Sequence, residues 1–283
     1  MNYFGRECVF TAALLAGTAL SSATIAATID WATVVNNGDT MPGSTAKFNS
    51  YNQPSINNAC TVVFRARSKG PSQPIRGIYS RSGCNPAREL VRLKAVGNLV
   101  PQPNNTGATF NEFPAFPRID LASGMVATRG QSEPVYRYML PDGTETRTGT
   151  SGIYAKPFGA MITGASQLGA VAGFEKFEVP GTLPGTRFDQ FPGAPSATSR
   201  TAIAFKGNYT EGVESRTGVF YRNISAGGGA APVQLVANSQ TLIPGESTVF
   251  GSTAPPSAAN DKMVFWVSTM KKLQPRAAST KQR

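Results

Sequence analysis

The sequence predicts an all-β protein made of short strands and turns. Only 15% of the 283 residues are charged, whereas 29 are glycine and 21 are proline, and turn formers at this density favour strands over helices. No long run of Ala, Leu, Glu and Lys recurs at helical spacing. One segment near the start of the chain returns three times, which predicts an array of repeated units.

The four copies of this segment form the repeat cores. Each opens with phenylalanine, and a proline precedes its central strand. Aromatic side chains supply a large apolar area to a shared core, and the proline fixes a turn where its missing N–H does least harm. The recurrence therefore identifies a scaffold rather than an active site. The cores are FNSYNQPSINNACTVVF (48–64), FNEFPAFPRIDLASGMVA (110–127), FDQFPGAPSATSRTAIAF (188–205) and FGSTAPPSAANDKMVFW (250–266).

Residues 1–27 have the layout of a secretory signal peptide. Arg6 lies near the start, an apolar run covers residues 9–20, and small residues precede a cleavage site after Ala26 or Ala27. The alternatives are a membrane anchor and a first strand of the fold. The apolar run has about 12 residues, fewer than the roughly 20 that span a bilayer, and no later segment is long and apolar enough. We therefore expect an exported mature chain without a transmembrane segment.

Removal of the signal peptide leaves two cysteines, Cys60 and Cys84. An even number of cysteines in an exported protein permits a disulfide, which would close a loop within the first repeat. The alternative is two unrelated thiols, because spacing alone cannot show that the two Cβ atoms approach.

Basic charge is concentrated at the C-terminus. The formal net charge is +11, and five basic side chains lie in the last thirteen residues, which leaves +6 for the rest of the chain. Residues 270–283 are expected to form a basic disordered tail. Such a tail can contact nucleic acid, acidic glycans or anionic lipid headgroups, but export argues against nucleic acid.

The first unit begins with an expected strand. TIDWATVV (28–35) is rich in β-branched residues and ends at an Asn-Asn-Gly-Asp turn. A second strand is expected at 61–66, inside the first core. Arg65, Arg67 and Lys69 alternate along and beyond it, which fits the solvent face of a strand that leaves the core. The alternative is a basic binding stripe.

The features that follow the cores also recur. A triplet of glycine, a β-branched residue and an aromatic residue stands at 77–79, 152–154 and 218–220. Its glycine lets the backbone pass close to a neighbour before the aromatic ring packs. Further strands are expected at 89–93 and 233–237.

The spacing of the cores indicates one insertion. The opening phenylalanines are 62, 78 and 62 residues apart, and the longer second unit carries its extra residues before its triplet, in the loop 132–149. Loops on a rigid scaffold commonly carry function, so residues 131–149 are the expected contacts with a ligand.

Units of this size favour a closed ring of sheets. Each unit would have three or four short strands and would need neighbours to bury its faces. We predict a β-propeller-like array of about four repeats within a β-repeat domain at 28–269, in which the strand at 28–35 completes the final sheet. The alternatives are an open β-solenoid, whose repeat is usually shorter, and an incomplete propeller.

These patterns together resemble a family of exported bacterial tandem-repeat proteins of unknown activity. The resemblance rests on a Pro-Gly turn, Phe-x-x-Phe/Tyr, Pro-Ser-Ile-Asn, Val-x-Phe and Gly-Ile-Tyr, and covers roughly residues 30–267. It implies propeller-like repeats, varied C-terminal surface anchors, and secretion or a place in the periplasm. The chain departs from the family in lacking the glycine usual near Cys60, which is shifted to Gly124 in the second unit, and an apolar anchor segment after Val267.

The residue types present exclude several kinds of chemistry. Histidine is absent, which removes Ser-His-Asp and Cys-His nucleophilic sites and the commonest zinc sites. Phosphate-binding and calcium-binding motifs are absent too. We therefore predict no catalytic, cofactor-binding or metal-binding residue and no cofactor. The acidic residues are scattered through expected loops, where solvent-exposed carboxylates are the rule.

The favoured function is that of an exported, non-enzymatic scaffold that binds an extracellular or periplasmic ligand, a glycan or a protein, but not nucleic acid. The alternative is a propeller-type glycosidase or lyase acting on an acidic polysaccharide, which would need two carboxylates within about 5–10 Å in one pocket. A third hypothesis is a structural envelope component whose basic tail docks on anionic lipids or glycans.

Overall fold

The protein is all-β, as the sequence predicts. The computed structural model describes residues 31–70, 74–157, 159–224 and 231–269. In these ranges it contains antiparallel sheets, none of them closed on itself, one 3-10 turn at Leu168–Ala170 (η1), and no α-helix. The expected signal peptide (1–27) and basic tail (270–283) lie outside the described residues.

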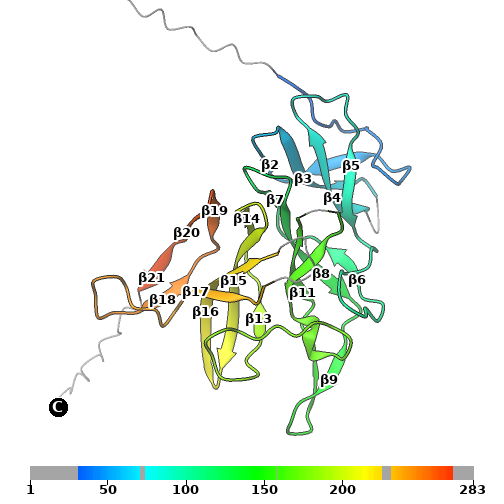
Figure 1. Ribbon diagram of the computed structural model, residues 1–283. Helices are drawn as coiled ribbons and strands as arrows, with labels where there is room; N and C mark the ends of the chain where they lie inside the picture. Colours follow the sequence, from blue (N-terminus) through cyan, green and yellow to red (C-terminus); the bar gives the residue numbers. More distant parts are fainter. Residues whose placement is uncertain (1–30, 71–73, 158, 225–230, 270–283) are drawn as a thin grey trace, which may run out of the picture. The chain divides into compact units, whose positions relative to one another are not determined.

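Three five-stranded sheets follow one another along the chain and share one strand order (Figure 1). The first consists of β1 (Phe48–Tyr51), β2 (Ser55–Ile56), β3 (Thr61–Ser68), β4 (Arg76–Ser82) and β5 (Val91–Ala95). The second consists of β6 (Thr109–Glu112), β7 (Arg118–Ile119), β8 (Val126–Glu133), β11 (Ser151–Lys156) and β12 (Ile162–Ser166). The third consists of β13 (Phe188–Gln190), β14 (Ser196–Thr198), β15 (Ala202–Glu211), β16 (Glu214–Asn223) and β17 (Gln234–Asn238).

The first strand of each sheet is broken into two pieces that pair with the same long neighbour. In the first sheet both β1 and β2 pair with β3, and the break between them contains Pro54. Proline has no N–H to donate to the ladder, so a break in an edge strand is a position where it fits. The other two sheets carry Pro117 and Pro195 at the corresponding break. A register shift also marks β1, β6 and β13, in each case between the opening phenylalanine of the core and the residue two positions later.

One pair of aromatic rings packs in the core of each five-stranded sheet. The ring centroids are 5.0 Å apart for Phe48 and Tyr79, 4.8 Å for Phe110 and Tyr154, and 4.9 Å for Phe188 and Phe220, all edge to face, the arrangement that aromatic quadrupoles favour. The glycine two residues before the second ring is required. A Cβ atom at Gly152 would lie 2.6 Å from the Tyr154 hydroxyl, and one at Gly218 would lie 2.8 Å from the Phe220 ring.

A separate hairpin projects from the second sheet. β9 (Arg137–Met139) and β10 (Glu145–Arg147) pair only with each other among the described strands (Figure 1). They lie between β8 and β11, so the extra residues of the second unit form this hairpin.

Two strand pairs follow the third sheet. β18 (Phe250–Thr253) pairs with β21 (Val267–Thr269), and β19 (Ser257–Ala259) pairs with β20 (Lys262–Val264). Their order along the chain is that of the broken first strand and its long neighbour in the complete sheets.

The short inner pieces of the broken strands contact one another in chain order, β2 with β7, β7 with β14 and β14 with β19. The Asn57 side-chain amide donates to the Ser123 carbonyl oxygen at 2.6 Å, and the Ser196 hydroxyl donates to the Pro256 carbonyl oxygen at 2.8 Å. Buried Val63, Ile119 and Val126 also pack together across the first two sheets. Successive sheets therefore meet along their broken edges.

Two expected strands differ from the structure. Residues 31–35 of the expected strand 28–35 form no strand, and residues 28–30 lie outside the described residues. Val34 and Val35 instead pack against the core of the first sheet, which contains Phe48, Phe64 and Tyr79. The Val34 carbonyl oxygen accepts a hydrogen bond from Arg81 at 2.7 Å. The expected strand 89–93 is displaced to Val91–Ala95. It follows a turn in which the Arg88 N–H donates to the Asn85 carbonyl oxygen, and Arg81 Nε donates to the Arg88 carbonyl oxygen at 3.1 Å.

Candidate functional site

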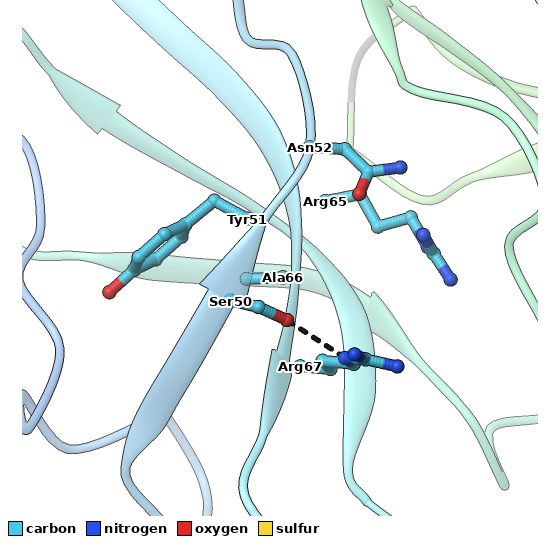
Figure 2. A pocket seen from close by; sticks show the side chains of 6 residues that line it. All are labelled: Ser50, Tyr51, Asn52, Arg65, Ala66 and Arg67. Carbon is cyan, nitrogen blue, oxygen red and sulfur yellow. Dashed lines mark hydrogen bonds between the residues drawn. The ribbon is translucent and has the colours of Figure 1, made fainter.

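A hollow between β1 and β3 is lined by two arginine side chains. It has a volume of about 310 Å³ and is formed by residues of the two strands and of the break in the first strand. Figure 2 shows the Arg65 and Arg67 side chains on one side of the strands and Tyr51 on the other. The lining residues are Ser50, Tyr51, Asn52, Arg65, Ala66 and Arg67. We call this the β1–β3 hollow.

The strand period explains why two guanidinium groups gather here. Arg65 and Arg67 are two residues apart on β3, so their side chains leave the same face. Arg67 lies directly opposite Arg76 on β4, which brings a third guanidinium group near the hollow without lining it. Like charges opposite each other in a sheet are unfavourable without a counter-ion.

Glu112 of the second sheet supplies one counter-ion. Its carboxylate oxygens lie 2.8 Å from Arg65 Nη2 and 2.7 Å from Arg76 Nη1. Burial raises the pKa of this carboxyl group, but the hydrogen bonds from Arg65 and the Phe113 N–H, and the charges of Arg65 and Arg76, outweigh it and the pKa is lowered. Glu112 is therefore ionised at neutral pH and links the first two sheets.

One cation of this cluster has no carboxylate partner among the described residues. Arg67 is exposed, and its Nε donates to the Ser50 hydroxyl at 2.8 Å. Burial and then the Asp39 charge raise the pKa of Tyr51, whose ring lies on the other side of the strands. The hollow thus offers guanidinium and amide donors, which suits an anionic or hydroxyl-rich ligand.

The expected contact loop 131–149 lines a second hollow, of about 300 Å³. Tyr138 and Arg147 contribute from the hairpin, and Gln167, Arg187 and Asp189 contribute from the second and third sheets. Gln167 is fixed in place: its Oε1 accepts from the Ser151 N–H at 2.9 Å and its Nε2 donates to the Asp189 carbonyl oxygen. We call this the hairpin hollow.

A third hollow, of about 260 Å³, lies at the turns of three successive units. Asp120 and Asp261 both line it, together with Arg200 and Asn260. Asp120 is only 1% exposed, and its Oδ2 accepts from the Ala122 N–H at 3.2 Å. The expectation that the acidic residues are surface groups is therefore wrong for Asp120. We call this the inner-turn hollow.

A larger hollow, of about 580 Å³, lies beside an ion pair that joins the second and third sheets. Arg222 is buried, donates to the Thr163, Gly164 and Ala231 carbonyl oxygens, and lies 2.9 Å from Glu175. All of its donor nitrogens are used, so Arg222 has a structural role.

Cys60 and Cys84 form a disulfide bond in the structure, with Cα atoms 5.5 Å apart. The bond joins the turn before β3 to the segment after β4, and it lies outside the residues that line the β1–β3 hollow.

The sequence indicated Arg65 and Arg67 but not their partners. The solvent-face interpretation is wrong for Arg65, which is half-buried against Glu112. Glu112 takes the position held by Ser50, Gln190 and Ser252 in the other units. A charged residue at a position that is neutral in the other three units was the feature of the sequence that could have indicated Glu112 as a partner of the arginines. Among the described residues, no group of three or more aspartate, glutamate, cysteine or histidine side chains is arranged to bind a metal ion. The same residues include no helix that is long and apolar enough to cross a bilayer.

Comparison with known proteins adds no assignment: no family model, curated protein or solved structure matches this chain.

Proposed function

We propose that this protein is an exported, non-enzymatic β-repeat scaffold that binds an acidic ligand in the β1–β3 hollow. The observation that carries the proposal is the charge of that hollow: Arg65 and Arg67 line it, and of these two only Arg65 has a carboxylate partner among the described residues. The ligand class is a saccharide chain with carboxylate groups, because Arg67 is placed to pair with a carboxylate and Asn52 to bond hydroxyl groups.

The proposed scaffold is a β-propeller. The three sheets with one strand order, the broken first strands that contact one another in sequence, and the shared aromatic pairs support the idea that the sheets are repeated blades. Blades around an axis present their inner strands to one another in this way. A place among exported bacterial tandem-repeat proteins, and localisation outside the cytoplasm, belong to the same proposal.

The test is binding of defined oligosaccharides by titration calorimetry. An oligomer of a uronic acid should bind the wild-type protein, and its neutral counterpart should bind at least tenfold more weakly. Arg67→Ala should weaken binding of the acidic oligomer about tenfold and reduce its salt dependence. Arg147→Ala in the hairpin hollow is the matched control. Equal binding of the acidic and neutral oligomers, or a larger effect of Arg147→Ala than of Arg67→Ala, would contradict the assignment to the β1–β3 hollow.

A second candidate function, cleavage of an acidic polysaccharide, is favoured by one observation. Asp120 and Asp261 line the same inner-turn hollow, and a pair of carboxylates can act as acid and as base or nucleophile in glycoside hydrolysis. Arg200 in the same hollow would attract the acidic substrate.

This candidate is tested by release of reducing ends from an acidic polysaccharide. If it is correct, Asp261→Asn abolishes the release while the acidic oligomer still binds, because Arg67 lies in a different hollow. Activity that survives both Asp261→Asn and Asp120→Asn would eliminate the candidate.

A further inference from the structure

Each complete sheet carries one basic side chain at the same position of its long strand, directly opposite the middle residue of the triplet at 77–79, 152–154 or 218–220. The three opposed pairs are Arg65 and Ile78, Arg129 and Ile153, and Lys206 and Val219. All three basic residues are half-buried. A cation therefore recurs once in every complete sheet, at a position that solvent reaches only in part.

At the junction of the first and second sheets, the protein neutralises this cation itself. The Glu112 carboxylate lies 2.8 Å from Arg65 and 2.7 Å from Arg76. Arg76 immediately precedes the triplet of β4, and Glu112 stands two residues after the phenylalanine that opens the second core. These two places, which we call the junction positions, can be located in the other units as well.

The second and third sheets meet at the same junction positions but without a carboxylate. Ser151 and Gln190 take these positions. Gln167 joins β11 to β13 there, because its Oε1 accepts from the Ser151 N–H at 2.9 Å and its Nε2 donates to the Asp189 carbonyl oxygen, next to Gln190. The second junction thus brings the corresponding strands together, with a neutral residue in place of the glutamate.

Arg129 consequently has no carboxylate partner among the described residues. Its Nε donates to the Ser151 hydroxyl at 3.3 Å, whereas the Asp189 carboxylate accepts from the Thr210 hydroxyl at 2.7 Å. Burial lowers the pKa of Arg129, because the charged form loses hydration and no ion pair offsets that loss.

The third sheet meets β18 in the same way. Thr217 and Ser252 take the junction positions, and the Thr253 N–H donates to the Thr217 hydroxyl oxygen at 2.8 Å. Lys206 has no carboxylate partner in the part of the chain that the structure describes, and burial lowers its pKa. Two successive junctions therefore keep the cation and lack the counter-ion of the first.

We propose that a long acidic saccharide crosses the three junctions, and that its carboxylates pair with Arg129 and Lys206 as Glu112 pairs with Arg65. The inference rests on the proposed function, in which a saccharide with carboxylate groups occupies the β1–β3 hollow beside Arg65. Carboxylates form charge-assisted hydrogen bonds with guanidinium and ammonium groups. Because the cation recurs once per sheet, it suits a ligand whose charge recurs along its length, and several such contacts on one chain reinforce one another.

A nucleic acid also carries recurring charge, but the junctions lack the side chains that bind its bases. Proteins that bind single strands stack the bases on aromatic rings. The side chains at the junction positions are all polar or charged and none is aromatic: Arg76 and Glu112, Ser151 and Gln190, and Thr217 and Ser252. Their hydroxyl and amide groups suit the hydroxyl groups of a sugar.

Titration calorimetry with uronic acid oligomers of two lengths tests the inference. A disaccharide, which is short enough to occupy one junction, should bind the wild type and lose affinity about tenfold in Arg67→Ala. An oligomer of about ten sugars should bind at least tenfold more tightly than the disaccharide. Arg129→Gln and Lys206→Gln should each weaken binding of the longer oligomer about three- to tenfold and leave the disaccharide unchanged. Lys262→Gln, which changes an exposed lysine on β20, is the matched control.

Gln190→Glu supplies the missing carboxylate and is the reciprocal variant. Pairing of the new carboxylate with Arg129 should raise the urea midpoint of unfolding. It should also weaken binding of the longer oligomer several-fold, because the new carboxylate competes with those of the ligand. Gln234→Glu adds the same charge at an exposed position of β17 and controls for the change in net charge.

The outcomes separate this inference from the proposed function. If the disaccharide binds in a way that depends on Arg67, but the longer oligomer is insensitive to both Arg129→Gln and Lys206→Gln, this inference is overturned and the proposed function stands. Failure of both oligomers to bind would overturn the two together. A single-stranded oligonucleotide of equal charge that binds more tightly than the saccharide, and loses affinity in the same variants, would assign the junctions to phosphate and would also overturn the inference.

Discussion

The hydroxyl group of Tyr79 is buried and has no hydrogen-bond partner among the described residues. A buried, unpaired hydroxyl costs about 1–3 kcal/mol. Phe220 occupies the corresponding position of the third sheet and packs on Phe188 with the same geometry, so the position does not require a hydroxyl group. Burial also raises the pKa of Tyr79 to about 12.

Tyr79→Phe should therefore raise the free energy of unfolding by about 1 kcal/mol. Phe220→Tyr is the reciprocal variant and should lower it by about 1–3 kcal/mol, because it buries a new hydroxyl. Urea denaturation followed by circular dichroism measures both. A Tyr79→Phe protein less stable than the wild type would mean that the hydroxyl has a partner in solution.

At the scale of the element, the sequence predicts what depends on local contacts. The phenylalanine that opens each core, the proline in the broken strand and the glycine triplet act within one sheet, and each recurs at the position where the sheet uses it. The strand expected at 28–35 does not form at 31–35, because β-branched residues favour a strand only where a neighbouring edge is free to pair. The β propensity of a segment does not show whether a neighbouring strand has a free edge to pair with it.

The disulfide between Cys60 and Cys84 stabilises one element, the hairpin of β3 and β4. The bond closes a loop with a sequence separation of 24 residues, and restriction of the unfolded chain at this length is worth about 3 kcal/mol. We expect the double variant Cys60→Ser, Cys84→Ser to lose about 2–4 kcal/mol of unfolding free energy, and the wild type to lose a similar amount in reductant. Denaturation curves that are unchanged by reductant would contradict this expectation.

At the scale of the whole molecule, the sequence does not predict which charges join the sheets. Arg65 and Glu112 are 47 residues apart, as are Glu175 and Arg222, and neither pair follows from local periodicity. The basic alternation on β3 indicated half of the β1–β3 hollow. Its other half comes from β1, which contains Ser50, and from the break after β1, which contains Asn52. The inner-turn hollow collects residues from three units, and only the contacts between successive sheets bring them together.

Glu112 connects the stability of the molecule to its proposed function. Its carboxylate neutralises Arg65 and Arg76 across the first two sheets, and its pKa is lowered in the folded protein. A lowered pKa contributes stability above the pKa of the unfolded state, about 4.3 for glutamate, and this contribution is lost as the pH falls through the lower, folded value. The same carboxylate competes with an acidic ligand for the guanidinium groups.

Glu112→Gln should therefore have opposite effects on stability and on binding. At pH 7 it should lower the free energy of unfolding by about 1–2 kcal/mol, less than for a fully buried pair because the partners are partly exposed, and the difference should shrink as the pH falls below about 4. Its affinity for the acidic oligomer should rise several-fold, because two guanidinium groups lose their counter-ion. Glu145→Gln, which breaks the exposed pair with Arg137, is the control and should change stability by less than about 1 kcal/mol. A Glu112→Gln protein that is destabilised but binds the oligomer no more tightly would show that Glu112 only joins the sheets and that the ligand does not reach Arg65.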